Sequence, residues 1–134
     1  MIKGDLTINS ETVPSNLMSV SDTDYTGASR ITGNLTLGDG VKAVESSAFG
    51  GAGIPGTLTL PEGLARIGDT AFRKNNLQGN IVIPESVTKI GTAAFSYAGN
   101  QKNALNFIVA SANPPAYSLN MHLQTKRMAP RFTL

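Results

Sequence analysis

GNLTLGDGVKAVESSAFGGAGIP (residues 33–55) is followed directly by GTLTLPEGLARIGDTAFRKNNLQ (56–78) and GNIVIPESVTKIGTAAFSYAGNQ (79–101). Each segment is 23 residues long, opens with glycine and continues with alternating apolar residues. An Ala-Phe pair follows at the same place in every segment, with its ring at Phe49, Phe72 and Phe95. A fixed period of this length is typical of repeat proteins, whose units bury their apolar faces by stacking on one another.

The opening of each unit predicts a short strand. In the Leu-Thr-Leu segments at residues 35–37 and 58–60, apolar and polar residues alternate, which is the period of a strand with one buried face. Pro61 and Pro84 then end the strand, because proline has no N–H group to donate to a ladder. A second extended edge follows, with apolar residues three positions apart, as in Leu64 and Ile67. We therefore expect two short extended segments in each unit.

The part of the unit after these strands predicts turns. We expect Gly68 and Gly91 to adopt a backbone conformation that a residue with a Cβ atom disfavours. The first repeat carries Glu45 at this position, which predicts a locally different turn. The Ala-Phe pair predicts a single helical turn, with alanine allowing close approach of the backbone and phenylalanine filling the interior. No segment is long enough for an ordinary helix.

A unit of this size has too little apolar surface to fold alone, so stacking is the expected solution. The strands of successive coils would then pair at about 4.8 Å. The sequence predicts an α/β-class solenoid of short parallel strands, turns and single helical turns, with the phenylalanines in one interior row. The usual crossover preference makes it right-handed. With degenerate units at both ends, we expect about four to five coils.

One domain, residues 1–134, accounts for the whole chain. Residues 1–32 form an N-terminal cap coil that repeats the strand opening at 4–8, and residues 33–55, 56–78 and 79–101 are full repeats. Residues 102–134 contain a degenerate repeat, with a strand at 105–109, and a C-terminal tail. In this tail Leu119, Met121 and Leu123 alternate with polar residues. Either the tail adds a final strand that caps the array, or residues 118–134 dock on a partner, including a further copy of the chain.

Composition excludes several classes of partner. The net charge is +2, but Lys126, Arg127 and Arg131 lie in the tail, so the remainder is close to neutral. Such a body lacks the basic, aromatic-rich face that binds nucleic acid. No apolar run approaches the length of about 18 residues that would indicate a membrane-spanning helix. The first residues are not followed by an apolar stretch either, so we expect no export signal here.

Catalytic and metal-binding residues are also scarce. The chain has no cysteine, and His122, its one histidine, lies in the irregular tail, where nothing orients it toward a nucleophile. A transition-metal site is therefore not expected. The glycines follow the repeat and not a nucleotide-binding motif. We predict a protein without enzymatic activity, metal site or cofactor.

Two charged stripes recur on the outside of the predicted coils. Acidic residues share one repeat position and basic residues another, four positions later: Asp39, Glu62 and Glu85, then Arg66 and Lys89. Calcium takes several oxygen ligands, whereas each coil offers one carboxylate here. We interpret both stripes as solvated turn charges.

The outward positions of the strands are the best candidates for binding. Small polar side chains dominate them, and such a surface can hydrogen-bond a glycan or a peptide. It lacks the Trp, Tyr and Arg anchors that dominate tight interfaces. The candidate binding residues are two rows, Asn34, Thr57 and Asn80, and Thr36, Thr59 and Val82, together with Tyr97 in a loop.

The order of strand, Pro-Glu-Gly/Ser, Ile-Gly and Ala-Phe resembles the BspA-like leucine-rich repeats of bacterial surface proteins. The resemblance covers residues 33–99 closely and residues 1–117 loosely, including the Asn-Pro-Pro at 113–115. It implies a curved leucine-rich-repeat solenoid without catalysis that binds host proteins, glycans or neighbouring cells. It also implies an extracellular or cell-surface location. This chain departs from the family in its small number of full repeats and its unmatched last 17 residues.

Two functions remain open at this point. The first is a non-enzymatic binding or adhesion module that recognises a protein or carbohydrate through its sheet face and loops. The second is a structural subunit of a larger assembly, such as a surface fibre or a virion decoration, that docks through the C-terminal tail. The second function would place the chain in a virion or in the cytoplasm.

Overall fold

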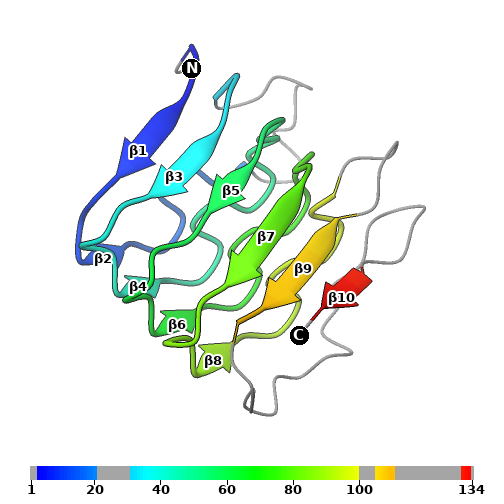
Figure 1. Ribbon diagram of the computed structural model, residues 1–134. Coiled ribbons are helices and arrows are strands. Elements are labelled where there is room, and N and C mark those ends of the chain that lie inside the picture. The colour runs from blue at the N-terminus through cyan, green and yellow to red at the C-terminus, as the bar shows by residue number, and fades with distance from the viewer. Residues whose placement is uncertain (1–2, 21–30, 100–104, 111–130, 134) are drawn as a thin grey trace.

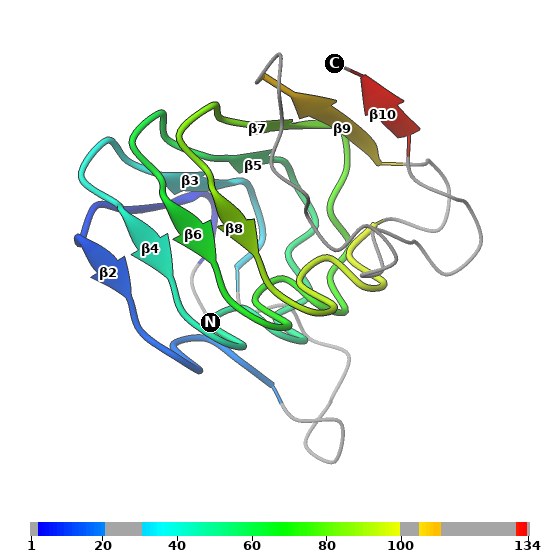
Figure 2. The ribbon, with the colours of Figure 1, turned by 90° about the horizontal axis from the view of Figure 1, so that it is seen from below.

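The computed structural model describes residues 3–20, 31–99, 105–110 and the backbone of 131–133. These residues form a parallel β-solenoid, in which strands from successive coils lie side by side (Figure 1). Two sides of the solenoid are sheets and the third consists of turns, as Figure 2 shows. The described ranges contain strands and turns but no helix.

The first side is a row of six parallel strands; five come from the segments that open the full and degenerate units, and the sixth comes from the C-terminal tail. The strands are β1 (Leu6–Ile8), β3 (Leu35–Leu37), β5 (Leu58–Thr59), β7 (Asn80–Ile83), β9 (Asn106–Val109) and β10 (Arg131–Thr133). In β3, β5 and β7 the leucine and isoleucine side chains point inward and are buried, while the residues between them point outward; in β9 the buried residues are Phe107 and Val109.

The second side is a four-stranded parallel sheet in the order β2-β4-β6-β8. Each strand is only two residues long and keeps the register of the repeat, so that Arg66 pairs with Lys89 and Ile67 with Ile90. This confirms the second extended edge of each unit. The strands are β2 (Thr12–Val13), β4 (Ala43–Val44), β6 (Arg66–Ile67) and β8 (Lys89–Ile90).

The third side contains turns at the Ala-Phe pairs and no helical turn, so the prediction of a helical turn there is wrong. Ser47, Thr70 and Ala93 have φ angles of 58°, 54° and 56°, in the left-handed region that interrupts a right-handed helix. Alternate N–H groups donate across to the next repeat, as from Phe49 to the Ala71 carbonyl at 2.8 Å. The N–H groups between them bond three residues back within their own turn. Stacking of the repeats therefore determines this backbone.

The coil count is also smaller than expected. The sheet β2-β4-β6-β8 spans about three turns of the solenoid, not the four to five that the degenerate ends suggested. At the C-terminal end, β10 pairs directly with β9 in parallel register. The tail thus supplies a strand at Arg131–Thr133, whereas Leu119, Met121 and Leu123 lie outside the described residues.

Close approach of neighbouring coils, and not an unusual φ angle, explains the glycines that follow the second strands. Neither Gly68 nor Gly91 has a positive φ. A Cβ atom on Gly91 would lie 2.5 Å from the backbone nitrogen of Asp69, and one on Gly68 would lie 2.7 Å from that of Ser46. Glu45 makes the same backbone hydrogen bond as its equivalents, so the expected difference in the first repeat's turn is wrong.

The interior is a single apolar cluster built around the aromatic row. The rings of Phe49, Phe72 and Phe95 are fully buried and stacked, with centroids 5.3 Å apart at each step. Phe107 extends the row with an edge-on contact at 5.1 Å. The shared interior confirms the stacking of the three repeats and holds the outer surfaces in fixed positions.

Candidate functional site

Six of the seven candidate binding residues lie together on the outward surface of β3, β5 and β7, which we call the sheet face. The ladder aligns Thr36 with Thr59, and Val82 follows them at the same position of the next repeat. Asn34, Thr57 and Asn80 form the neighbouring row, at the start of these strands. All except the half-buried Thr36 are exposed, and Val82 has 46% of its surface accessible.

The two rows of the sheet face differ in whether their side chains already take part in hydrogen bonds between strands. Asn34 Oδ1 accepts a hydrogen bond from the Thr57 N–H at 2.9 Å, and Asn80 Oδ1 accepts one from Asn106 Nδ2 at 2.9 Å. These amides therefore hold neighbouring strands together. Within the described residues, the hydroxyls of Thr36 and Thr59 make no such bond. The row of Thr36, Thr59 and Val82 is consequently the part that is free to contact a ligand.

The sheet face is hydrogen-bonded as two three-stranded groups, β1-β3-β5 and β7-β9-β10. Gly79, which enters β7, has a φ of 82°, whereas the equivalent Gly56 does not have a positive φ. Between β3 and β5, the Asn34 side chain accepts a hydrogen bond from the Thr57 N–H. Thr57 stands at the equivalent position one repeat later and has no carboxamide that could bond Asn80 in the same way. The break in the ladder therefore falls beside Thr57.

At the end of β7 the sheet face opens into a hollow of about 440 Å³. Val82 forms part of its wall, and Glu62 and Glu85 of the acidic stripe line it as well. Both carboxylates belong to exposed residues. Glu45 is used differently, because it forms an ion pair with Arg66 of the basic stripe on the second side. The hollow thus combines an apolar contact with negative charge.

Tyr97 lies apart from the other six candidates. It belongs to the turns of the third side, with a φ of 55° and 38% of its surface exposed. The sequence placed it correctly in a loop, but the fold separates that loop from the sheet face.

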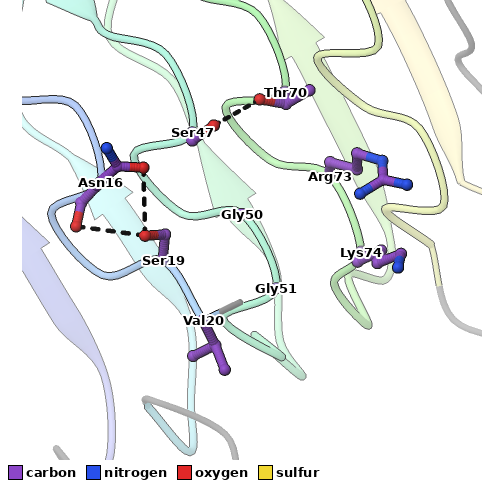
Figure 3. Close-up of a pocket in the computed structure, with 9 residues that line it drawn as sticks. All are labelled: Asn16, Ser19, Val20, Ser47, Gly50, Gly51, Thr70, Arg73 and Lys74. Atoms are coloured by element: carbon purple, nitrogen blue, oxygen red, sulfur yellow. Dashed lines mark hydrogen bonds between the residues drawn. The ribbon is translucent and has the colours of Figure 1, made fainter. Parts of the chain in front are cut away.

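A second hollow, on the third side, was missed by the sequence analysis (Figure 3). Ser19, Ser47, Thr70, Arg73 and Lys74 are among its lining residues, and its volume is about 390 Å³. The sequence does contain an indication of this hollow, because Gly50-Gly51 of the first full repeat is replaced by Arg73-Lys74 in the second. Comparing how the repeats differ, and not only what they share, would have pointed to this place.

The described residues were also compared with what a metal site and a membrane-spanning helix require. No group of three or more His, Cys, Asp or Glu side chains lies there in an arrangement that could hold a metal ion. None of the segments described is a helix long and apolar enough to cross a bilayer. His122 lies outside the described residues.

The repeat architecture agrees with a comparison against protein families. Residues 3–113 match the family described as BspA type leucine-rich repeat region (6 copies). The chain belongs to this family. The resemblance found in the sequence is confirmed, and the BspA-type match begins before the first full repeat and ends after the third. Among curated proteins and solved structures, none matches the chain.

Membership in the BspA-type family carries a general statement about function. Leucine-rich repeats are generally a non-enzymatic fold for protein interaction, and the BspA-type proteins are typically surface-associated in bacteria. The family is therefore consistent with a surface module of the binding or adhesion type.

Proposed function

We propose that this protein is a non-enzymatic binding module, displayed outside a bacterial cell, that contacts a protein or carbohydrate through its sheet face. The observation that supports this most is the row of Thr36, Thr59 and Val82. The paired strands β3 and β5 align Thr36 with Thr59, Val82 follows at the same repeat position in β7, and the two hydroxyls make no hydrogen bond with the part of the chain that the structure describes. A rigid element positions such a surface better than a loop does.

The chemistry of the sheet face favours a partner with both polar and cationic groups. The threonine hydroxyls donate and accept hydrogen bonds, and Val82 offers an apolar contact. Glu62 and Glu85, at the hollow beyond it, favour a positively charged group on the partner. Because the face lacks Trp and Arg anchors, we expect moderate affinity that multivalent display would increase.

The alternative of a structural subunit that docks through residues 118–134 receives less support. The last described segment of this tail, β10, pairs with β9 of the same chain. A strand that is already paired in its own sheet has to break that pairing before it is donated to the sheet of another protein. The pairing favours a role for the tail as a cap of the array.

The proposal is tested with arrays of glycans and of purified extracellular proteins. A ligand found in this way should lose at least about tenfold in affinity for Thr59→Arg, which places a long charged side chain in the centre of the row. Thr88→Arg is the matched control, because Thr88 is exposed on another side of the solenoid. Equal affinities of the two variants would exclude the sheet face. Absence of any ligand, together with a stable oligomer in solution, would favour the structural subunit.

A further inference from the structure

The step from β5 to β7 is the one place in the described part of the first side where neighbouring strands share no ladder pair (Figure 1). On the other edge of β5, the Leu35 N–H donates to the Thr57 carbonyl at 2.9 Å. The backbone groups of a strand alternate between its two neighbours, so those of Leu58 and Leu60 are directed toward β7. The Leu60 N–H donates to no backbone group of the described residues.

β7 presents its own edge of this step in the same way. On the side of β7 that faces β9, the Ala110 N–H donates to the Ile83 carbonyl at 3.0 Å. By the same alternation, the N–H and C=O groups of Val82 are directed toward β5. Backbone groups that could complete a ladder therefore face one another without forming one. We call this place the seam; it lies between residues 58–60 of one coil and 80–83 of the next.

Hydrogen bonds fix the chain at both ends of the seam. Before it, Gln78 donates from its N–H to the Gly56 carbonyl at 3.1 Å and from Nε2 to the Pro55 carbonyl at 2.9 Å. After it, the Thr88 N–H donates to the Ala65 carbonyl at 2.9 Å. The leucine and isoleucine side chains behind the seam are buried. The seam is therefore a local interruption of the ladder and not a boundary between two domains.

A side chain at one repeat position bridges each of the two preceding steps. Asp5 Oδ1 accepts a hydrogen bond from the Asn34 N–H at 2.7 Å, and Asn34 Oδ1 accepts one from the Thr57 N–H at 2.9 Å. In both cases the oxygen reaches the N–H of the same position in the next coil. Thr57 occupies this position at the seam and carries neither a carboxamide nor a carboxylate. The ladder is thus interrupted at the step that lacks the side-chain bridge.

We propose that the seam is a local opening site, at which water separates β5 from β7 and the two strands part and close while the rest of the solenoid stays paired. Backbone groups without a protein partner bond water instead. The second side stays paired across the same two coils, because Ile67 pairs with Ile90. The third side does as well, since the Phe72 N–H donates to the Ala94 carbonyl at 2.8 Å. The motion is therefore confined to the first side.

The seam crosses the middle of the sheet face. Thr59 and Val82, which are both exposed, lie on its two edges. Closing the seam brings these residues to the spacing of paired strands, about 4.8 Å, and opening it separates them further. The row of Thr36, Thr59 and Val82 can therefore adjust its spacing at this one step. The opening itself follows from the hydrogen bonds of the first side and does not require that the sheet face bind a ligand.

Amide hydrogen exchange of the full chain, followed by NMR, tests the proposal. The N–H groups of Leu60 and Val82 face the seam, whereas those of their neighbours Thr59 and Ile81 face the intact ladders with β3 and β9. After correction for intrinsic rates, we expect exchange at least about 100-fold faster at Leu60 and Val82 than at Thr59 and Ile81. Equal protection of the two pairs would overturn the proposal.

Thr57→Asn supplies the missing side-chain bridge, because its Oδ1 would reach the Asn80 N–H as Asn34 reaches that of Thr57. We expect exchange at Val82 to slow by at least about tenfold in this variant. Thr57→Ser is the matched control, since it keeps a hydroxyl at the same exposed position and should leave the rate unchanged. Asn34→Thr removes an existing bridge and should speed exchange at Thr59 by at least about tenfold. Identical exchange at Val82 in Thr57→Asn and Thr57→Ser would also count against the proposal.

Discussion

The side-chain Oδ1 of Asn75 accepts a hydrogen bond from the backbone N–H of Ile54 at 2.9 Å, across 21 residues of chain. The Nδ2 atom of the same amide donates to the carbonyls of Phe49 and Phe72 at 3.0 and 2.9 Å. Asn75 is 5% exposed, and its repeat equivalents are the buried alanines Ala52 and Ala98. One amide thus fastens the first full repeat to the second from inside the solenoid.

Replacement of Asn75 by alanine should destabilise the protein by about 2–4 kcal/mol, because it removes the hydrogen-bond partner of the Ile54 N–H and of the Phe72 carbonyl and one of the two bonds to the Phe49 carbonyl. Denaturant titration followed by circular dichroism measures this loss. Asn76→Ala is the control, since this neighbouring side chain is exposed and should change stability by less than about 0.5 kcal/mol. Similar losses in both variants would show that the bonds of Asn75 are not the cause.

Substitution of Gly91 by alanine should cost about 1–3 kcal/mol, because the new methyl group meets the backbone of Asp69 and Gly68 in the neighbouring coil. Gly50→Ala makes the same chemical change where the nearest atom to the new Cβ, the Thr70 carbonyl oxygen, is 3.4 Å away. We expect the thermal midpoint to fall for Gly91→Ala and to change little for Gly50→Ala. The reverse order would contradict the packing explanation for the glycines.

The ion pair between Glu45 and Arg66 should contribute little. Its side chains are 33% and 54% exposed, so solvent and salt screen the attraction. Glu45→Gln is expected to lower the free energy of unfolding by less than about 1 kcal/mol at low salt, and by less still at high salt. Glu62→Gln serves as the reference for removing an exposed acid. A large loss for Glu45→Gln that persists at high salt would mean that Glu45 has a structural role beyond this pair.

Most of the correct predictions about the fold came from features that recur in every repeat. The alternation at 35–37 and its copies predicted the inward residues of the first side, and the recurring Ala-Phe predicted the aromatic row. Both features are periodic, so three copies supported each inference. The six outward positions of the sheet face followed from the same alternation, because strand side chains point to opposite faces in turn.

Departures from the repeat were harder to interpret. Asn75 stands where the other repeats have alanine, and its importance depends on carbonyls that only the folded chain brings near it. The positive φ of Ser47 and Thr70 likewise arises from hydrogen bonds between coils, which local propensity does not contain. The third-side hollow needs glycines of one repeat beside cations of the next. Each of these features belongs to a pair of neighbouring coils, and so a single unit does not reveal it.

The row of stacked rings holds the outer surfaces of the solenoid in position. The most direct test of this shared interior is to compare the denaturant unfolding of Phe72→Ala with that of Phe49→Ala. Phe72 stacks on a ring at both sides, whereas Phe49 stacks on one. We predict a loss of about 3–5 kcal/mol for Phe72→Ala and a smaller loss for Phe49→Ala, each in a single cooperative transition. Losses below about 1 kcal/mol in both variants would contradict a shared interior.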